Sequence, residues 1–286
     1  MGKFLKALKK SEALNKQPSP ELPPTKVVNI SPGTVDASKV PSTPTQGSVE
    51  ESPLPCGQLD PRLASFLEPG SLAVESFKLL LAKILARESK YRLRTIMVTS
   101  PLPMDGRSMV ATNLAISIAW RINEHVLLVD CDLRHPSLEN ILGLNAHKGI
   151  SEYLKKGTSV GPYLIKTPIG KLTLLPAGKP SPNPSELLSS ERTQRLVEEL
   201  RGTYEGRYII VNATPAQFSA ETTFLASMVD GVLLVVRAGK TPRDSILEAV
   251  ENIGRNKIVG LVFNGSNERN KDYYRHYYRY YQIIQR

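Results

Sequence analysis

The chain has 286 residues, of which 41% are hydrophobic, which is enough to bury one sizeable core with a short accessory segment. It has no run of roughly 18 apolar residues and no signal-peptide pattern at its N-terminus, so a cytoplasmic protein is expected, and its two cysteines and four histidines exclude a disulfide framework and a zinc site. The formal charge of +10 predicts an anionic partner, such as a nucleotide, an acidic lipid, a nucleic acid or an acidic protein tail.

The chain begins with two segments that lack a globular pattern. Residues 1–15 predict a basic amphipathic helix, for which contact with a membrane surface or partner and simple disorder are alternatives. Residues 16–58 are rich in Pro, Ser and Thr and have no periodicity, so they predict a disordered linker. We expect a folded domain over residues 59–268 and a tyrosine-rich tail over residues 269–286.

Helices and strands alternate from residue 71 onward. Helices are predicted over 71–88, 107–122, 185–204 and 242–255, and strands over 94–100, 125–133, 171–178, 208–214, 230–239 and 257–266. Near-continuous runs of Val, Ile and Leu in the strands indicate a mostly parallel sheet covered by helices on both faces. The expected fold is a doubly wound α/β fold, whose ligands bind at the carboxyl ends of the strands.

The segment SPLPMDGRSM, residues 100–109, matches a phosphate-binding loop in part. The template GxxxxGK[ST] finds Gly106 and Ser108 in place, but Pro101 stands at its first glycine and Arg107 at its lysine. The segment follows an apolar strand and opens a helix, whose N-terminal N–H groups and dipole favour an anion. An ordinary connection between a strand and a helix is the alternative interpretation.

Two carboxylates follow the next strand, in the sequence VDCDLRHPS. Asp130 and Asp132 are two residues apart and lie on the same side of an extended chain. Paired carboxylates at a strand end beside a phosphate loop suit a hydrated magnesium ion and an acceptor hydroxyl. A solvated acidic turn is the alternative.

Together these motifs resemble the bacterial protein-tyrosine kinases, which belong with the MinD/ParA-type P-loop ATPases. The family's loop SPxPGEGKST corresponds here to SPLPMDGRSM, and its strand VLLIDADLRRPSLH corresponds to VLLVDCDLRHPSLE. Its stretches GxxPPNPxELL and VIIDTPP correspond to AGKPSPNPSELL and YIIVNATPA. Its tyrosine-rich tail corresponds to YYRHYYRYY. The resemblance spans residues 59–281. It implies ATP and Mg²⁺ binding, autophosphorylation and regulation of exopolysaccharide biosynthesis or export.

The resemblance also assigns roles to matching positions. It implies catalytic roles for Asp130, Asp132 and Arg107, and metal binding by Ser108, Asp130 and Asn212. The nucleotide is expected on Pro103, Met104, Asp105, Gly106, Arg107, Ser108 and Met109. The phosphoacceptors are expected to be Tyr273, Tyr274, Tyr277, Tyr278, Tyr280 and Tyr281.

Several positions depart from the family pattern. Arg107 keeps the charge of the lysine but not its compact point contact, and Met104 replaces a glycine, which costs about 1–2 kcal/mol if the position needs a positive φ. Met109 replaces a hydroxyl residue, and Asn212 replaces an aspartate, although Glu221 is expected to keep a carboxylate near the pocket. We therefore expect weakened nucleotide binding with slow or absent catalysis. Two hypotheses follow: a tyrosine kinase, or an impaired pseudokinase that serves as binding partner or phosphoacceptor.

The resemblance implies further partners. Cytoplasmic members of the family pair with a membrane chain-length regulator or activator, so we expect indirect membrane association. The family's ExxRxxR helix, tied to a homo-oligomer, has Glu75 in place but Lys78 and Leu81 at its arginine positions, and an ordinary surface helix is the alternative. For the tail, a single-stranded nucleic-acid arm and a packing helix are alternatives, but we expect no nucleic acid. A partition-type ATPase is disfavoured by the tyrosine tail.

Overall fold

The computed structural model describes residues 59–63, 72–91, 93–120, 124–156, 159–203 and 206–265. The expected N-terminal helix, the expected linker and the tyrosine-rich tail lie outside these residues. Within the described part of the chain, no helix combines the length and the apolar character needed to span a membrane.

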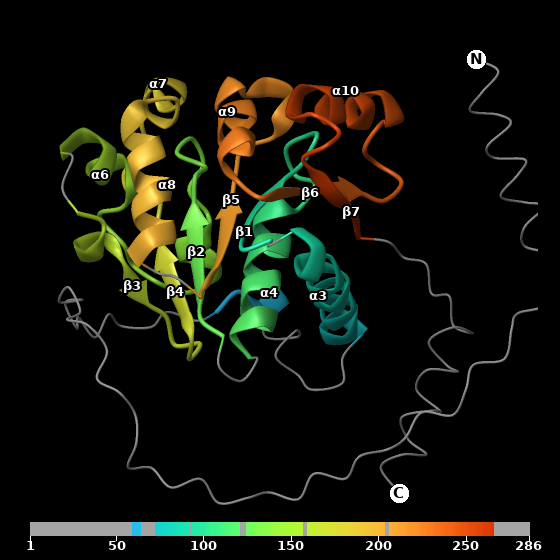
Figure 1. The fold of residues 1–286 in the computed structure, drawn as a ribbon, viewed down its shortest axis with the longest axis horizontal. Coiled ribbons are helices and arrows are strands. Elements are labelled where there is room, and N and C mark those ends of the chain that lie inside the picture. Colours follow the sequence, from blue (N-terminus) through green and yellow to red (C-terminus); the bar gives the residue numbers. More distant parts are fainter. Residues whose placement is uncertain are drawn as a thin grey trace, which may run out of the picture. The chain divides into compact units, whose positions relative to one another are not determined.

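A seven-stranded sheet runs through the described domain in the order β3-β4-β2-β5-β1-β6-β7 (Figure 1). Its strands are β1 (Thr95–Thr99), β2 (Val126–Asp130), β3 (Ile165–Lys166), β4 (Leu172–Leu175), β5 (Tyr208–Asn212), β6 (Gly231–Arg237) and β7 (Ile258–Asn264). The short strand β3 pairs antiparallel with β4, and the other pairs are parallel. The predicted doubly wound, mostly parallel α/β fold is therefore confirmed.

Helices cover both faces of the sheet. They are α3 (Leu72–Tyr91), α4 (Arg107–Ala119), α5 (Leu138–Ile141), α6 (Ile150–Lys156), α7 (Pro184–Leu188), α8 (Glu191–Thr203), α9 (Ala220–Met228) and α10 (Arg243–Ile253), with 3₁₀ turns at Gly161–Tyr163 and Ala216–Phe218. Helices α3, α4 and α5 share one hydrophobic cluster with the sheet, and α6, α8, α9 and α10 share the other.

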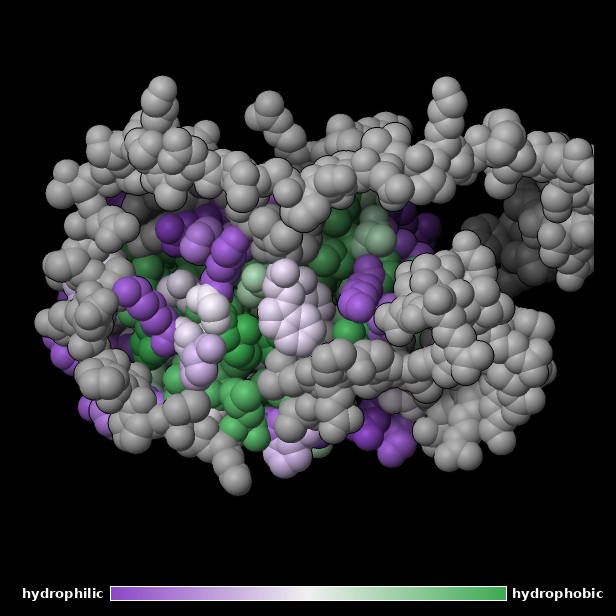
Figure 2. Space-filling view, turned by 90° about the horizontal axis from the view of Figure 1, so that it is seen from below, coloured by the Kyte–Doolittle hydropathy of each residue, from purple (hydrophilic) through white to green (hydrophobic). Residues whose placement is uncertain are grey.

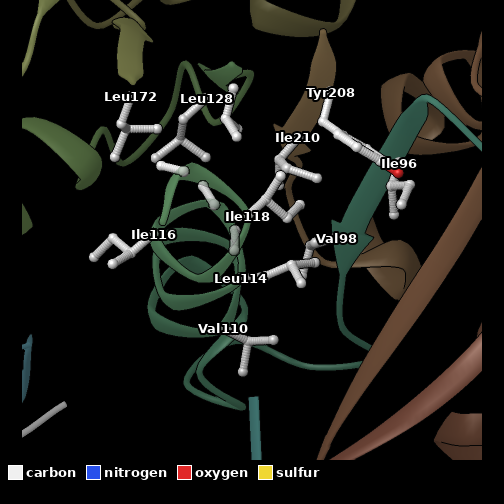
Figure 3. Packing of buried hydrophobic residues seen from close by; sticks show 14 of the residues in the cluster. Ile96, Val98, Val110, Leu114, Ile116, Ile118, Leu128, Leu172, Tyr208 and Ile210 are labelled. Carbon is white, nitrogen blue, oxygen red and sulfur yellow. The ribbon is translucent and has the colours of Figure 1, made fainter. Parts of the chain in front are cut away.

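The period-two pattern of the strands explains this two-sided core. In β1, Ile96 and Val98 belong to the cluster on the α4 side, whereas Met97 between them belongs to the other cluster. Along α4, Leu114 and Ile118 lie one turn apart and point toward the strands (Figure 3). Helix α4 is buried along most of its length because it packs against both the sheet and α3.

The predicted helix over residues 185–204 is wrong in one respect, because the structure divides it into α7 and α8. The division falls at Ser189 and Ser190. The hydroxyls of Ser190 and Thr193 both donate to the carbonyl of Leu187, at 2.6 Å and 3.0 Å, and so satisfy a backbone acceptor where α7 ends. Helices α5, α6 and α9 lie in segments for which no element was predicted.

The carboxyl ends of β1, β2 and β5 meet at one edge of the sheet. The register pairs Val98 with Asn212 and Asp130 with Asn212, which brings the ends of the three strands side by side. The opposite side, seen from below in Figure 2, exposes apolar residues among polar ones. Trp120, just after α4, is 46% exposed.

Candidate functional site

The loop from residue 100 to residue 106 connects β1 to α4 and is tied to the neighbouring strands. The Asp105 carboxylate accepts hydrogen bonds from the Thr241 hydroxyl at 2.7 Å and from the backbone N–H of Leu102 at 3.1 Å. Arg237 Nη1 donates to the carbonyl of Met104 at 2.9 Å, and Asn264 Nδ2 donates to the carbonyl of Asp105 at 2.9 Å. The ends of β6 and β7 therefore hold the loop in place.

Gly106 is the residue at which the loop becomes α4, and both its backbone conformation and its surroundings favour glycine. Its φ is +95°, in the left-handed region that favours glycine. A Cβ atom at this position would lie 2.0 Å from Asn264 Nδ2. The close approach of Asn264 and the backbone conformation both require the residue that the loop pattern predicted.

Neither Met104 in the loop nor Met109 in the first turn of α4 fills the interior of the loop. Met104 has a φ of +67°, so the condition under which its side chain costs energy is met, and that side chain is 78% exposed. Met109 is partly buried and packs against the hydrophobic cluster on the α4 side. The backbone N–H groups at the start of α4 therefore remain the anion-binding feature of the loop.

Asp130 ends β2 and is completely buried. Its carboxylate accepts hydrogen bonds from Asn212 Nδ2 at 2.9 Å and from the backbone N–H groups of Asp132, Ser137 and Leu138 at 3.1, 3.2 and 3.2 Å. Burial raises the pKa of Asp130 to about 6, although these hydrogen bonds act in the opposite direction. The residue is therefore held on all sides by donors of the protein.

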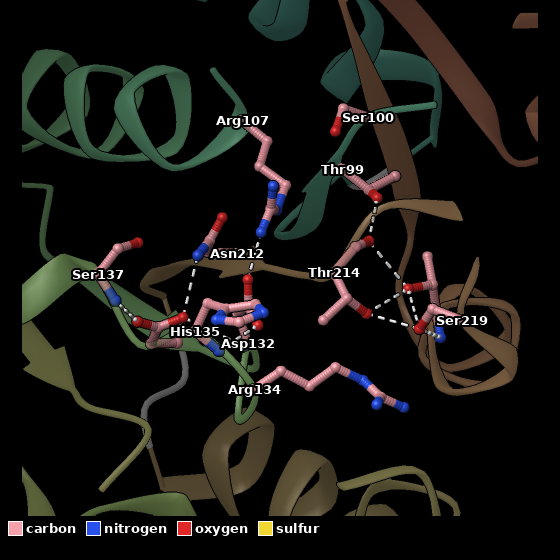
Figure 4. Close-up of polar contacts among 12 residues, drawn as sticks. Thr99, Ser100, Arg107, Asp132, Arg134, His135, Ser137, Asn212, Thr214 and Ser219 are labelled. Carbon is pink, nitrogen blue, oxygen red and sulfur yellow. Dashed lines mark hydrogen bonds and ion pairs between the residues drawn. The ribbon is translucent and has the colours of Figure 1, made fainter. Parts of the chain in front are cut away.

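Asp132 forms an ion pair with Arg107, the first residue of α4 (Figure 4). The other oxygen of Asp132 accepts from the backbone N–H of His135 at 3.0 Å. Arg107 Nε and Asn212 Oδ1 are buried, and neither has a hydrogen-bond partner in the described part of the chain. The ion pair thus connects the helix start to the segment after β2 and leaves one donor and one acceptor unused.

Glu221, in the first turn of α9, contacts Arg134 in the segment after β2, so a carboxylate lies near the site as expected. It is completely buried and accepts from the Ser185 hydroxyl at 2.7 Å and from Arg134 Nε at 3.3 Å. Burial by itself raises the pKa of Glu221, but the hydrogen bond from Ser185 and the positive charge of Arg134 bring it below its usual range. Glu221 therefore positions Arg134, two residues beyond Asp132.

A buried group of hydroxyls connects the end of β1 to the segment after β5. The Thr99 hydroxyl donates to the carbonyl of Thr214 at 2.6 Å. The Thr214 hydroxyl lies 2.6 Å from that of Ser219 and 2.9 Å from that of Thr222 (Figure 4). This group fixes the two strand ends that flank the site.

The structure brings the predicted site residues together in two pairs, Arg107 with Asp132 and Asp130 with Asn212. Ser108 follows Arg107 in α4, and Pro103 lies in the exposed part of the loop. The predicted acceptor tyrosines lie outside the described residues. Sequence reasoning missed the loop contacts of Arg237 and Asn264, although both residues end strands of the sheet, and strand ends are where the site was sought.

Two of the three residues predicted to hold magnesium, Asp130 and Asn212, do not fit a metal ion as they are arranged. The lone pairs of Asp130 are directed at four N–H donors, and Asn212 turns its amide nitrogen toward that carboxylate. The described residues contain no group of three or more His, Cys, Asp or Glu side chains placed to hold a metal. What the arrangement offers an anion is the set of backbone N–H groups at the start of α4.

The chain is similar to bacterial kinases in sequence and structure. It is 30% identical to the tyrosine-protein kinase YwqD of Bacillus subtilis over 212 residues, which cover 73% of this chain and 88% of that protein. It superposes on the kinase domain of the Escherichia coli tyrosine kinase ETK with a TM-score of 0.68 and 26% identity, over 74% of this chain and 82% of that chain.

A more distant likeness concerns the fold alone. The cell division ATPase MinD of Pyrococcus furiosus matches with a TM-score of 0.51 and 18% identity, over 62% of this chain and 75% of that chain. No protein-family model matches the chain.

Proposed function

This chain belongs to the bacterial tyrosine-protein kinases, and we propose that it is a nucleotide-binding member with impaired phosphoryl transfer. It acts in the regulation of exopolysaccharide biosynthesis or export, as a binding partner or as a phosphoacceptor. The observation that carries this proposal is the ion pair between Arg107 and Asp132.

Retained nucleotide binding is supported by the backbone of the loop. The loop keeps the glycine that closes it at Gly106, and α4 directs its free N–H groups and its dipole at the same point. The side chain of Met104 is 78% exposed and so does not fill the loop. An anion such as a polyphosphate can therefore approach the start of α4.

Impaired catalysis is supported by the side chains around that loop. Phosphoryl transfer depends on the positioning of the reactants and on neutralisation of developing charge. Arg107, at the position of the family's lysine, is paired with Asp132, and Asn212 supplies no charge at the position of the family's aspartate. With both carboxylates engaged by the protein itself, neither is free to take a proton from an incoming tyrosine hydroxyl.

The remaining parts of the chain have proposed roles outside catalysis. The six tyrosines between residues 273 and 281 serve as phosphoacceptors for an active relative, and the basic helix and linker over residues 1–58 stay a prediction. A membrane chain-length regulator is the proposed partner of a cytoplasmic protein, which gives indirect membrane association without a nucleic-acid ligand. A homo-oligomer has no support from α3, because Lys78 pairs with Glu75 at 2.8 Å and Leu81 is buried in the core.

An autophosphorylation assay on the purified full chain tests the proposal. After incubation with Mg²⁺ and ATP we expect no phosphotyrosine, whereas an added active family member labels the tail. Replacement of the tail tyrosines by phenylalanine removes that labelling. Phosphotyrosine that forms without the second kinase and disappears in Asp130→Ala contradicts the proposal.

An active tyrosine kinase is the second candidate. It is favoured by the placement of Asp130 and Asp132 at the end of β2, beside the loop, as the family pattern requires. The assay separates the two candidates, because only an active kinase labels itself.

A further inference from the structure

We propose that the Arg107 guanidinium is the resident cation of this site, so that it binds a free nucleoside polyphosphate without a divalent metal ion. The inference rests on the proposed function, which requires nucleotide binding but leaves open whether a metal accompanies the nucleotide. The side chains of Asp130 and Asn212 do not fit the magnesium ion that the family implies.

The first step concerns Asp130, whose acceptor capacity is already used. An ionised carboxylate has about four lone-pair directions. Four protein donors occupy them, namely the side-chain amide of Asn212 and three backbone N–H groups. A metal ion could bind Asp130 only by displacing one of these donors, which would then be left unsatisfied in a buried environment.

Asn212 is uncharged, and it donates a hydrogen bond where the family's aspartate could only accept one. An aspartate at this position would face Asp130 with a second negative charge, and a divalent cation would relieve their repulsion. Asn212 instead donates a hydrogen bond to Asp130 at 2.9 Å, and its register partner across the sheet is Asp130 itself. The two strand ends are therefore compatible with each other in the absence of a metal.

The third step concerns Arg107, which places a permanent positive charge next to Asp132. The side chains of Arg107 and Asp132 are 12% and 1% exposed, so the pair is shielded from solvent. Although Asp132 offsets this charge, the pair keeps a cationic group at the start of α4, where the family implies a metal ion.

The fourth step concerns the donor that Arg107 has left. Its Nε–H is buried and has no partner among the described residues, while its terminal nitrogen is engaged by Asp132. Arg107 is also the first residue of α4, next to the free backbone N–H groups at the helix start. The guanidinium therefore keeps a donor beyond the one that Asp132 engages, and it can offer this donor to a phosphate oxygen once the side chain turns to expose Nε.

Calorimetric titration of the full chain with ADP, in EDTA and in Mg²⁺, tests this inference without turnover. For the wild-type chain we expect dissociation constants that agree within about threefold in the two buffers. For the double variant Arg107→Lys with Asn212→Asp, which restores the two family residues, we expect EDTA to weaken binding by about tenfold or more.

Two single variants test whether ADP binding depends on the positive charge at Arg107 in particular or on the net charge of the protein. Arg107→Met is expected to weaken ADP binding in EDTA by about tenfold or more. Arg255→Met, which removes an equal charge from the 74% exposed Arg255 beyond α10, is expected to bind as the wild type does. Far-ultraviolet circular dichroism confirms that each variant is folded before titration.

The outcomes distinguish this inference from the proposed function. Wild-type binding that requires Mg²⁺ overturns the inference and leaves the proposed function intact. Wild-type affinity in Arg107→Met, measured in EDTA, overturns the role of the guanidinium. If ADP does not bind the wild-type chain in either buffer, the proposed nucleotide binding fails and the inference fails with it.

Discussion

Arg107, the first residue of α4, forms an ion pair with Asp132, and the side chains of both residues are largely shielded from solvent. Removing one member of such a pair leaves the other buried without compensation, which costs about 3–5 kcal/mol. We therefore expect Arg107→Ala to lower the free energy of unfolding by an amount of this order. Urea denaturation of the wild type and the variant measures it.

The double variant Arg107→Met with Asp132→Leu is the control for this pair. Because it removes both charges, it leaves no buried charge without a partner. We expect it to be more stable than the sum of the two single changes, Arg107→Met and Asp132→Leu, allows. Additive losses would show that the two side chains do not interact in solution.

Asp130 makes stability depend on pH in a predictable direction. Because burial raises the pKa of Asp130 to about 6 from 3.8, the unfolded chain releases this proton at lower pH than the folded chain does. The free energy of unfolding should therefore decrease as pH rises between about 4 and about 6, and this contribution should stay constant above that range. The full effect is at most about 3 kcal/mol.

Comparison with Asp130→Asn isolates this effect from other titrating groups. Urea denaturation of both proteins is measured at several pH values in EDTA. The stability of the wild type relative to the variant should fall across the stated range. A difference that does not change with pH would contradict the raised pKa of Asp130.

Gly106 is expected to tolerate no side chain. Gly106→Ala places a Cβ 2.0 Å from Asn264 Nδ2 at a residue whose φ is +95°. The left-handed conformation costs about 1–2 kcal/mol, and the displacement of Asn264 adds to this. Gly239→Ala is the matched control, because Gly239 has a φ of +69° and open space around its Cβ position.

Thermal unfolding of these two variants separates conformational strain from steric overlap. We expect a larger loss of Tm in Gly106→Ala than in Gly239→Ala. Equal losses would mean that Asn264 moves away from Gly106 at no cost.

Met104 carries backbone strain that glycine should relieve. Its φ of +67° disfavours any side chain, and its own side chain is mostly exposed. Met104→Gly is therefore expected to raise the free energy of unfolding by up to about 1 kcal/mol, since the loss of strain exceeds the added flexibility of the unfolded chain. Met104→Ala keeps the Cβ and should give no gain in urea denaturation, and an equal gain in both variants would contradict the strain.

Glu221 is expected to stabilise the protein through the hydrogen bonds that it accepts from Arg134 and Ser185. Glu221→Gln removes the charge that faces Arg134 and weakens the acceptor for Ser185, which should cost about 1–3 kcal/mol. Glu251→Gln is the control, because Glu251 forms an exposed pair with Arg255 at 3.7 Å. The control should change stability by less than about 1 kcal/mol in urea denaturation. Similar losses in both would contradict a structural role of Glu221.

The sequence by itself predicted the alternating elements, the mostly parallel sheet and the loop that follows β1. It could do so because the burial of a strand or helix is written in the periodicity of its own residues. It also predicted that Asp130, Asp132 and Asn212 belong to strand ends or to the segments directly after them. The break between α7 and α8 escaped it, because the hydroxyl contacts at Leu187 compete locally with a continuous helical pattern.

Only the tertiary structure decided which side chains are partners. Arg107 and Asp132 are 25 residues apart and Asp130 and Asn212 are 82 apart, so their contacts depend on the order and register of separate strands. It also decided that Met109 packs against the core and that Met104 points to solvent. Local pattern determines which residues are buried, whereas the pairing of donors with acceptors depends on how distant segments are brought together.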